Sequence, residues 1–308
     1  MNHKYDISSQ ISIIIPAFNE QNGIAETLSG LIKEFPAAEI IVVNDGSNDE
    51  TENAILKFEQ VICLNHDFNR GYGSALKTGM RYANRNFIAW FDADNEHKPG
   101  ELKSMLKKLS SSKNVAIIAS RNTPSVSNLR GYGKFAIRIV ARVLGVKLGR
   151  DVNCGLRVFK SSIIKPYLDL LPSGFSASVT STMILVERGY PFEFYSVKLN
   201  PRIGESKVTV SDGFTTLTLV LRMVTLFAPL RIFFRGGVVL IIGGIIYGLI
   251  LALNLGRGVP PAAVLTTLSG VLLCILGLIA DQISQMRLNQ LIDSSVTVRK
   301  TDHFIERK

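Results

Sequence analysis

Three carboxylates stand within five residues in the first third of the chain, at Asp92, Asp94 and Glu96. They follow the apolar run 87–91, which has the length and composition of a buried strand, and Pro99 then favours the start of a helix. Crowded carboxylates repel one another unless a cation lies between them, and their hard oxygen atoms suit Mg²⁺ or Mn²⁺. The spacing therefore indicates a divalent metal site able to hold a diphosphate, although a solvated acidic turn has the same short pattern.

Segments that alternate between strand and helix surround this acidic turn. The predicted strands are residues 11–15, 39–43, 61–64, 87–91, 115–119, 156–159 and 192–199. The predicted helices end near Glu34, Glu59, Asn84 and Leu109, and Asp49 can cap the second of them. This order and spacing predict an α/β domain with a mostly parallel sheet and right-handed crossovers.

Polar residues follow several of these strands at the end where each one finishes. Glu20 follows the first strand, Asp45 the second and Arg121 the fifth. Because parallel strands bring their carboxyl ends to one edge of a sheet, these side chains should converge with the acidic turn on a single crevice. His97 is the one histidine expected nearby, and we assign it a structural role because its neighbours already supply hard oxygen ligands.

The composition and the remaining motifs weigh against several classes of function. The 308 residues carry a formal net charge of +10 and the sequence pI is near 9.6, which favours an anionic partner. No nucleic-acid-binding motif accompanies this charge, and anionic lipid explains it better. Three scattered cysteines give neither a disulfide framework nor a zinc-site spacing. Gly71 and Gly73 lack the third glycine of a dinucleotide-binding fingerprint, because Leu76 stands in its place.

Two long apolar runs near the C-terminus predict a membrane hairpin. Residues 236–253 and 259–280 contain no charged side chain, and each run is long enough to span a bilayer. Arginine and lysine flank the pair, whereas the turn between the runs carries only Arg257. The positive-inside rule therefore places the N-terminal region and both termini in the cytoplasm. Residues 212–234, rich in Thr, Leu and Val, are interpreted as amphipathic helices at the bilayer interface.

Four motifs occur in an order that resembles a known family. They are residues 13–20 (IIIPAFNE), 42–47 (VVNDGS), 92–94 (DAD) and 202–207 (RIGESK). Together they resemble the family 2 glycosyltransferases of the GT-A fold, in the branch similar to dolichol-phosphate mannose synthase and bacterial polyprenyl-phosphate glucosyltransferases. The resemblance covers roughly residues 11–207. It implies a cytoplasmic GT-A catalytic domain over 1–210, interfacial helices over 211–234, a transmembrane hairpin over 235–284 and a cytoplasmic tail over 285–308.

The resemblance also implies a role for each matching residue. The nucleotide-sugar donor would be bound by Pro16, Phe18, Glu20, Asp45, Asp92, Ala93, Asp94, Arg202 and Lys207. Glu20 and Asp45 would accept hydrogen bonds from the base or the ribose. Mg²⁺ or Mn²⁺ would bridge the diphosphate, ligated by Asp94 and Glu96; relatives often have Gln in place of Glu96, which leaves the metal preference open. The acceptor phosphate would be received by Arg121 and Arg130, and the residues implied in catalysis are Asp92, Asp94, Arg121 and Arg202.

The implied activity is an inverting transfer of a hexose from a UDP- or GDP-sugar to a polyprenyl or dolichyl monophosphate. Such a phosphate has a second pKa of about 6, so it is already a nucleophile at neutral pH and needs no strong general base. Two alternatives stay open: a non-catalytic nucleotide-sugar-binding membrane subunit, and a polysaccharide synthase. The Gln-x-x-Arg-Trp motif of such synthases is absent, since the only tryptophan is Trp90. The expected partners are the donor, the lipid phosphate and the bilayer, without nucleic acid; a homo-oligomer is left open.

Overall fold

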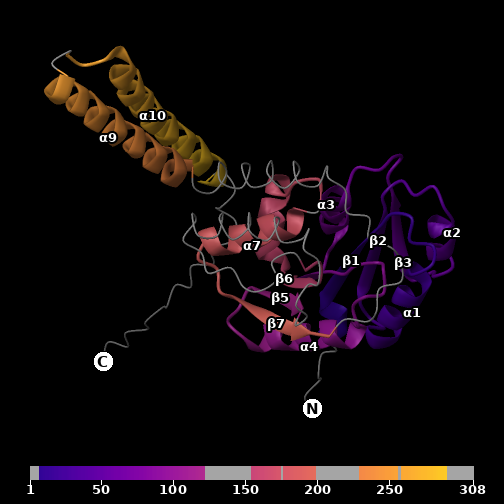
Figure 1. Cartoon of the computed structure of the whole chain (residues 1–308). Helices are drawn as coiled ribbons and strands as arrows, with labels where there is room; N and C mark the ends of the chain where they lie inside the picture. The colour runs from indigo at the N-terminus through magenta and orange to yellow at the C-terminus, as the bar shows by residue number, and fades with distance from the viewer. Residues whose placement is uncertain (1–6, 122–153, 175, 199–228, 256–257, 290–308) are drawn as a thin grey trace, which may run out of the picture.

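The computed structural model describes residues 7–121, 154–174, 176–198, 229–255 and 258–289. Within these ranges the N-terminal part of the chain forms a sheet covered by helices, and the C-terminal part forms a helical hairpin that stands apart from the sheet (Figure 1). Three residues predicted to bind substrate, Arg130, Arg202 and Lys207, lie outside the described ranges. Most of the segment predicted to lie at the bilayer interface is outside them as well.

The sheet contains seven strands in the order β3-β2-β1-β4-β6-β5-β7. Their bounds are β1 Ile11–Ala17, β2 Glu39–Asn44, β3 Val61–Asn65, β4 Phe87–Trp90, β5 Ala116–Arg121, β6 Arg157–Lys160 and β7 Phe192–Val197. Neighbouring strands are parallel except around β6, which runs antiparallel to both β4 and β5. The predicted α/β class with a mostly parallel sheet is therefore confirmed.

β1 continues through Pro16, where the sequence predicts its end. Pairing of β1 with β4 stops at Ile14, whereas pairing with β2 continues to Ala17. The Ile14 carbonyl accepts a hydrogen bond from the Phe91 amide, so the nitrogen of Pro16, two residues on, points toward the same side. β4 has ended at that level, and a proline without an N–H therefore leaves no gap in the ladder.

Helices cover both faces of the sheet. One face is covered by α3 (Tyr72–Tyr82), α6 (Ser161–Ile164), the 3-10 helix η2 (Lys165–Leu170) and α7 (Ala177–Glu187). The other is covered by α1 (Ile24–Glu34), α2 (Thr51–Ile55) and α4 (Pro99–Ser111), while η1 (Ile7–Gln10) precedes β1. Ile14 faces the first core and Ile13 the second, so β1 is buried on both faces and its isoleucines do not alternate with exposed polar residues.

α2 is shorter than predicted, because it ends at Ile55 rather than near Glu59. Asp49 does accept a hydrogen bond from the amide of Thr51, the first helical residue, at 3.0 Å. The chain then leaves the helix through a turn in which the amide of Val61 donates to the carbonyl of Phe58. This turn brings the chain to the start of β3, and the need to reach that edge strand limits the length of the helix.

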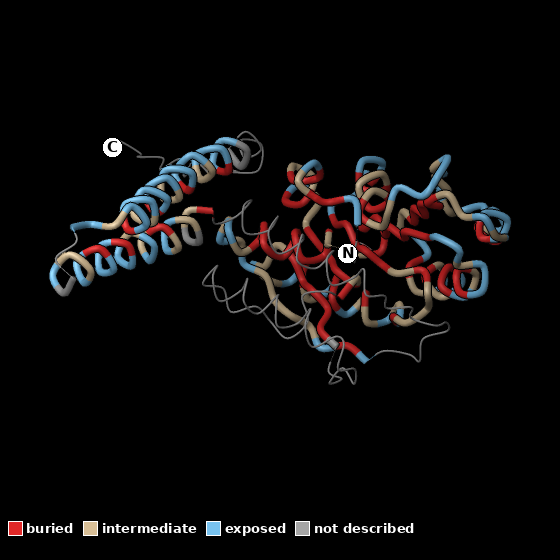
Figure 2. Tube along the Cα trace, turned by 45° about the horizontal axis from the view of Figure 1, so that its top comes forward, coloured by how far each residue is buried: buried red, intermediate tan, exposed pale blue. Residues whose placement is uncertain are grey.

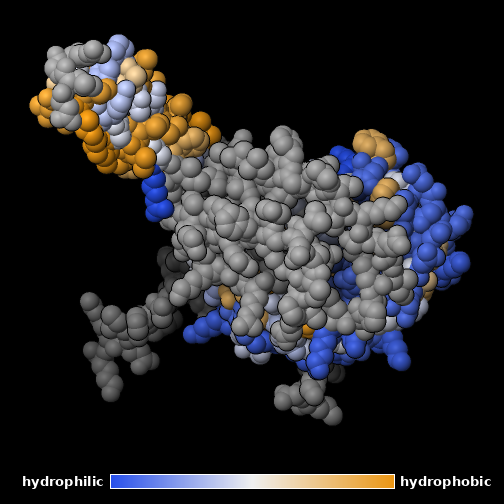
Figure 3. Space-filling view, in the orientation of Figure 1, coloured by the Kyte–Doolittle hydropathy of each residue, from blue (hydrophilic) through white to orange (hydrophobic). Residues whose placement is uncertain are grey.

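The hairpin consists of α9 (Pro229–Leu255) and α10 (Pro261–Asn289). Its apolar stretches, Phe233–Leu253 and Pro261–Met286, have mean hydropathies of 2.5 and 2.4 and are only 17% buried over their most apolar windows. Figure 2 shows that the hairpin is largely exposed. Figure 3 shows that it is largely hydrophobic, whereas the coloured surface of the sheet domain visible in that view is mainly hydrophilic. The two helices therefore have the length, composition and exposure of a membrane-spanning pair. α9 also includes the last residues of the segment predicted to lie at the interface.

Candidate active site at the carboxyl edge of the sheet

The acidic turn after β4 is fastened to the first turn of α1. The side-chain hydroxyl of Thr27 donates to the carbonyl of Ala93 at 3.0 Å, and both residues are buried. A Cβ added to Gly23 would lie 3.1 Å from the same carbonyl, so the backbone of α1 approaches the turn closely. The N-terminal end of α1 thereby lies beside the carboxylates, where the helix dipole favours negative charge.

Asp94 and Glu96, which are both half-buried, form the second half of the acidic turn. The Asp94 carboxylate accepts a hydrogen bond from the Glu96 amide at 3.1 Å, and Asn95 between them has a left-handed backbone with φ of +58°. No three His, Cys, Asp or Glu side chains in the described part of the chain are arranged to hold a metal ion. Mg²⁺ sites commonly use one or two carboxylates and complete the shell with water and phosphate oxygens. Two carboxylates such as these could supply the protein ligands of a metal ion that a bound diphosphate shares.

Asp92 is half-buried, with Tyr72, His97 and Gly155 beside it. The Tyr72 hydroxyl donates to Oδ1 of Asp92 at 2.9 Å, and Nε2 of the buried His97 lies 3.9 Å from Oδ2. A Cβ at Gly155 would overlap the Asp92 carboxylate, so a larger residue there would displace this side chain. Burial, and then the negative charge of Asp92, raise the pKa of Tyr72 well above its usual range. The phenol therefore keeps its proton at neutral pH and always donates to Asp92.

A fully buried guanidinium, that of Arg157, lies near the Tyr72 phenol. Nε of Arg157 donates to the carbonyl of Cys154 at 2.9 Å, and Nη1 donates to the hydroxyls of Ser181 and Thr182 on α7 at 3.0 and 2.7 Å. The positive charge of Arg157 partly opposes the rise in the pKa of the Tyr72 phenol. Sequence reasoning missed Arg157; the signal was a single arginine inside the predicted strand 156–159, whose other residues are apolar.

Asp45, at the end of β2, holds the segment that leads into α3. One carboxylate oxygen lies 2.6 Å from Nδ1 of His66 and accepts from the Arg70 amide at 2.9 Å, and the other accepts from the Gly71 amide at 2.8 Å. Nε2 of His66 lies 2.9 Å from the hydroxyl of Thr78, further along α3. Asp45 and His66 therefore link β2, the 66–71 segment and α3.

The expectation that His97 is the one histidine near the acidic residues was wrong. His66 follows the last residue of β3 and contacts Asp45 directly. The signal that could have found His66 is the same one that selected Asp45, a polar residue at the carboxyl end of a parallel strand.

Phe18 and Glu20 lie in a loop that is joined to the loop after β2. The amide of Asn19 donates to the hydroxyl of Ser47 at 3.0 Å, and the amide of Glu20 donates to the hydroxyl of Thr51 at 2.8 Å. Phe18 is 41% exposed, so its ring is accessible to a ligand. The first two loops of the carboxyl edge thus form one connected surface.

Arg121 is the last residue of β5 and pairs in register with Val197. β5 runs in the same direction as β4, because both are antiparallel to β6. Arg121 therefore reaches the same edge of the sheet as the acidic turn. Residues that follow β1, β2 and β4 and the last residue of β5 thus lie at one edge of the sheet, as the parallel order predicts.

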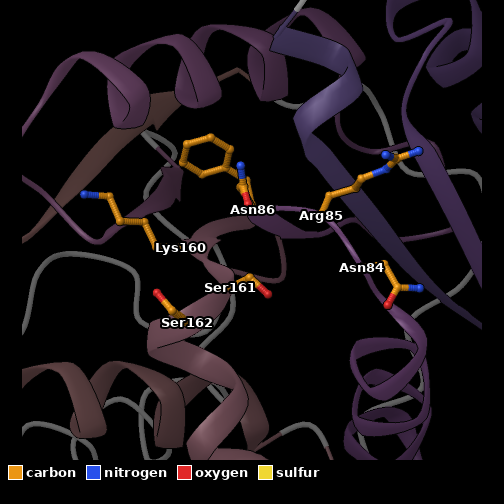
Figure 4. Close-up of a pocket in the computed structure, with 7 residues that line it drawn as sticks. Asn84, Arg85, Asn86, Lys160, Ser161 and Ser162 are labelled. Atoms are coloured by element: carbon orange, nitrogen blue, oxygen red, sulfur yellow. The ribbon is translucent and has the colours of Figure 1, made fainter. Parts of the chain in front are cut away.

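A hollow of about 460 Å³ lies at the opposite edge of the sheet (Figure 4). It is lined by Asn84, Arg85, Asn86, Phe87, Lys160, Ser161 and Ser162. Phe87 begins β4 and Lys160 ends the antiparallel β6, which places both away from the carboxyl ends. Figure 4 shows Lys160 and Arg85 directed to opposite sides, so their charges do not converge on a common ligand position.

The fold and this edge define a glycosyltransferase of the GT-A type. Residues 12–163 match the family described as glycosyl transferase family 2, and residues 228–286 match the GtrB C-terminal hairpin. The chain belongs to glycosyl transferase family 2, which confirms the resemblance seen in the sequence motifs.

Individual proteins show the same likeness. An uncharacterised protein of Methanocaldococcus jannaschii is 32% identical over 201 residues, covering 62% of this chain and 80% of its own length. The UDP-N-acetylglucosamine–dolichyl-phosphate N-acetylglucosaminyltransferase of Methanococcus voltae is 25% identical, covering 58% of this chain and 80% of its own length. Glucosyl-3-phosphoglycerate synthase of Mycobacterium tuberculosis, solved with Mn²⁺, UDP and phosphoglyceric acid, shares the fold with a TM-score of 0.58 at 14% identity, covering 70% of this chain and 78% of that one.

Proposed function

We propose that this chain transfers a hexose from a nucleotide diphosphate sugar to a polyprenyl monophosphate at a membrane. The observation that carries the proposal is one chain combining a carboxylate edge suited to a metal–diphosphate with an exposed apolar hairpin. A lipid-linked acceptor explains why the two are joined. The archaeal relative named for transfer to dolichyl phosphate supports the same acceptor class.

On the donor side, Asp94 and Glu96 would hold Mg²⁺ or Mn²⁺, which supplies charge neutralisation on the diphosphate leaving group when bound. Asp92 would face the donor sugar, held in one orientation by its neighbours. The exposed ring of Phe18 and the carboxylate of Glu20 would contact the nucleotide. These roles agree with the sequence resemblance, which also assigns donor contacts to Pro16, Ala93, Arg202 and Lys207.

Asp45 has a more restricted part in this proposal than the sequence indicates. Its buried carboxylate already accepts hydrogen bonds from the Arg70 and Gly71 amides and contacts His66. A carboxylate has about four acceptor positions, so little of its capacity is left for a base or a ribose. We propose that Asp45 serves nucleotide binding mainly by holding the 66–71 segment in place.

On the acceptor side, the lipid phosphate would attack the anomeric carbon in line and displace the nucleoside diphosphate with inversion. The phosphate is largely dianionic at neutral pH, so the enzyme needs to position it rather than deprotonate it. Arg121, at the end of β5, would bind this phosphate, and the resemblance adds Arg130. The positive-inside pattern places this chemistry and both termini on the cytoplasmic side.

A donor screen tests the proposal directly. The full chain in detergent is incubated with undecaprenyl or dolichyl phosphate, Mg²⁺ or Mn²⁺ and a panel of UDP- and GDP-sugars, and lipid products are identified by mass spectrometry. One donor giving a monophosphate-linked glycolipid is the expected result. Nucleoside diphosphate release without a glycolipid would point to a different acceptor and overturn the proposal.

The screen also separates the two alternatives. A non-catalytic nucleotide-sugar-binding subunit would bind a donor without turnover, and the carboxylates at the sheet edge weigh against it. A polysaccharide synthase would add several sugars to one acceptor, which the same mass spectra would show.

A further inference from the structure

The first turn of α3 contacts the acidic turn through the side chain of Tyr72, a residue that none of the four sequence motifs contains. Resting on the proposed function, we propose that Tyr72 is a positioning residue that sets the orientation of the Asp92 carboxylate for sugar transfer. The contact is the 2.9 Å hydrogen bond from the Tyr72 hydroxyl to Oδ1 of Asp92.

The surroundings leave the Asp92 carboxylate little freedom once Tyr72 holds it. Gly155 closes one side, since even a Cβ there would overlap both oxygens. His97 lies beyond the other oxygen at 3.9 Å, which is too long for a hydrogen bond. Of Tyr72, Gly155 and His97, it is therefore Tyr72 that makes a hydrogen bond to the Asp92 carboxylate in the contacts described. A hydrogen bond to a charged acceptor is stronger than one between neutral groups.

Tyr72 can hold a carboxylate only if its own backbone is fixed, and the contacts on one side of the helix start do this. The Gly71 amide donates to the buried carboxylate of Asp45 at 2.8 Å. His66 bridges the same carboxylate to Thr78, one and a half turns further along α3. The start of the helix is thereby tied to the end of β2.

The segment before α7 fixes the other side of the helix start. The Ser74 amide approaches the carbonyl of Ser173 at 3.1 Å. A Cβ at Gly71 would lie 2.6 Å from that carbonyl, and a Cβ at Gly73 would overlap the carbonyl of Pro172. Gly71 also has a backbone φ of +93°, a conformation that residues other than glycine rarely adopt. Glycines on both sides of Tyr72 thus let two backbones meet and hold the tyrosine in place.

The arrangement connects two parts of the donor site that are distant in sequence. Asp45 holds Gly71, and the next residue, Tyr72, holds Asp92, so one helix start links the edge near the nucleotide with the edge near the sugar. Loss of the phenol should act first on Asp92, to which its hydroxyl donates, and should leave Asp94 and the nucleotide loops in place, because the Glu96 amide and the Ser47 and Thr51 hydroxyls contact these groups. The expected defect is in turnover, not in nucleotide binding.

The test compares Tyr72→Phe with Tyr82→Phe in the full chain. Tyr82 ends the same helix and is 58% exposed, so its hydroxyl serves as a matched control. Transfer is measured with the sugar nucleotide that the wild-type chain uses in the donor screen, affinity with UDP or GDP plus Mn²⁺, and folding by the thermal midpoint. Tyr72→Phe should lower kcat about 10- to 100-fold with affinity and midpoint unchanged, in line with losing a bond to a charged group.

Each other outcome decides against a specific claim. Wild-type kcat in Tyr72→Phe would overturn the positioning role while leaving the proposed function standing. A joint fall of kcat, nucleotide affinity and thermal midpoint would mean that Tyr72 is structural only, and would also overturn the positioning role. No transfer by the wild-type chain with any donor of the panel would overturn the proposed function and this inference with it.

Discussion

The Asp45 carboxylate lies 2.6 Å from Nδ1 of His66, and the side chains of both residues are almost completely buried. The pair joins the ends of two parallel strands, β2 and β3, at the edge where the ligand is expected. The acidic residue of the 42–47 motif therefore supports the architecture of this edge through contacts within the protein.

His66→Ala should destabilise the protein by about 1–3 kcal/mol, because the buried Asp45 carboxylate and the Thr78 hydroxyl each lose a partner. Hydrogen exchange at the Arg70 and Gly71 amides should become faster as Asp45 loosens. Ser104→Ala, which removes an exposed hydroxyl on α4, is the control and should change neither quantity. Exchange at Arg70 and Gly71 as slow as in the wild type would show that Asp45 holds the segment without His66.

Asp94→Asn should reduce sugar transfer by at least about 100-fold, because a neutral amide is a poor ligand for Mg²⁺ or Mn²⁺. The thermal midpoint should stay close to the wild-type value, since Asp94 is half-buried rather than part of the core. Asp169→Asn removes a highly exposed carboxylate and should keep full activity. Turnover by Asp94→Asn under metal-limited conditions would contradict the metal assignment.

Gly155→Ala should lower turnover strongly, because the added methyl group would displace the Asp92 carboxylate from its bond with Tyr72. Gly100→Ala is the matched control: a Cβ there meets nothing within 4 Å, and alanine in the first turn of α4 is a better helix former. Kinetics and thermal melting of both variants check this. Equal activities would show that the acidic turn shifts to accommodate the methyl group.

Gly237→Ala should destabilise the hairpin by about 1–3 kcal/mol, as overpacking of a close contact does. A Cβ at this position would lie 2.6 Å from the carbonyl of Gly270 on α10, whereas a Cβ at Gly243 would meet nothing within 4 Å. Gly243→Ala on the same helix is therefore the control and should melt like the wild type. The measurement is thermal unfolding in one detergent, and identical melting of the two variants would contradict this packing of α9 on α10.

The stability of the sheet domain should fall as the pH rises from 10 to 12. Burial, and then the hydrogen bond with Tyr190, raise the pKa of Tyr167 from 10.0 to about 12. Below pH 10 the Tyr167 phenol is protonated in both the folded and the unfolded chain, so its contribution to the free energy of unfolding is complete. Above pH 10 the unfolded chain binds fewer protons than the folded chain, so the free energy of unfolding decreases as the pH rises. Denaturant titrations at several pH values check this, and Tyr167→Phe should weaken the dependence. An equal slope in that variant would assign the effect to other groups.

Local patterns in the sequence were enough to predict the strands, the acidic turn at the end of one strand and the apolar hairpin. Each of these depends on residues close together in the chain, such as Asp92 and Asp94 after an apolar run. Parallel order then predicted that Asp45 and the acidic turn share an edge, since that follows from topology alone.

Only the tertiary structure decided which side chains meet at this edge. Tyr72 is 20 residues from Asp92 and His66 is 21 residues from Asp45, and no spacing rule links such pairs. The antiparallel β6 is a similar case, because it pairs Arg157 with Trp90 on β4 and brings the preceding Gly155 to the Asp92 carboxylate. Contacts of this kind depend on how helices and loops pack on the finished sheet, which local sequence patterns do not encode.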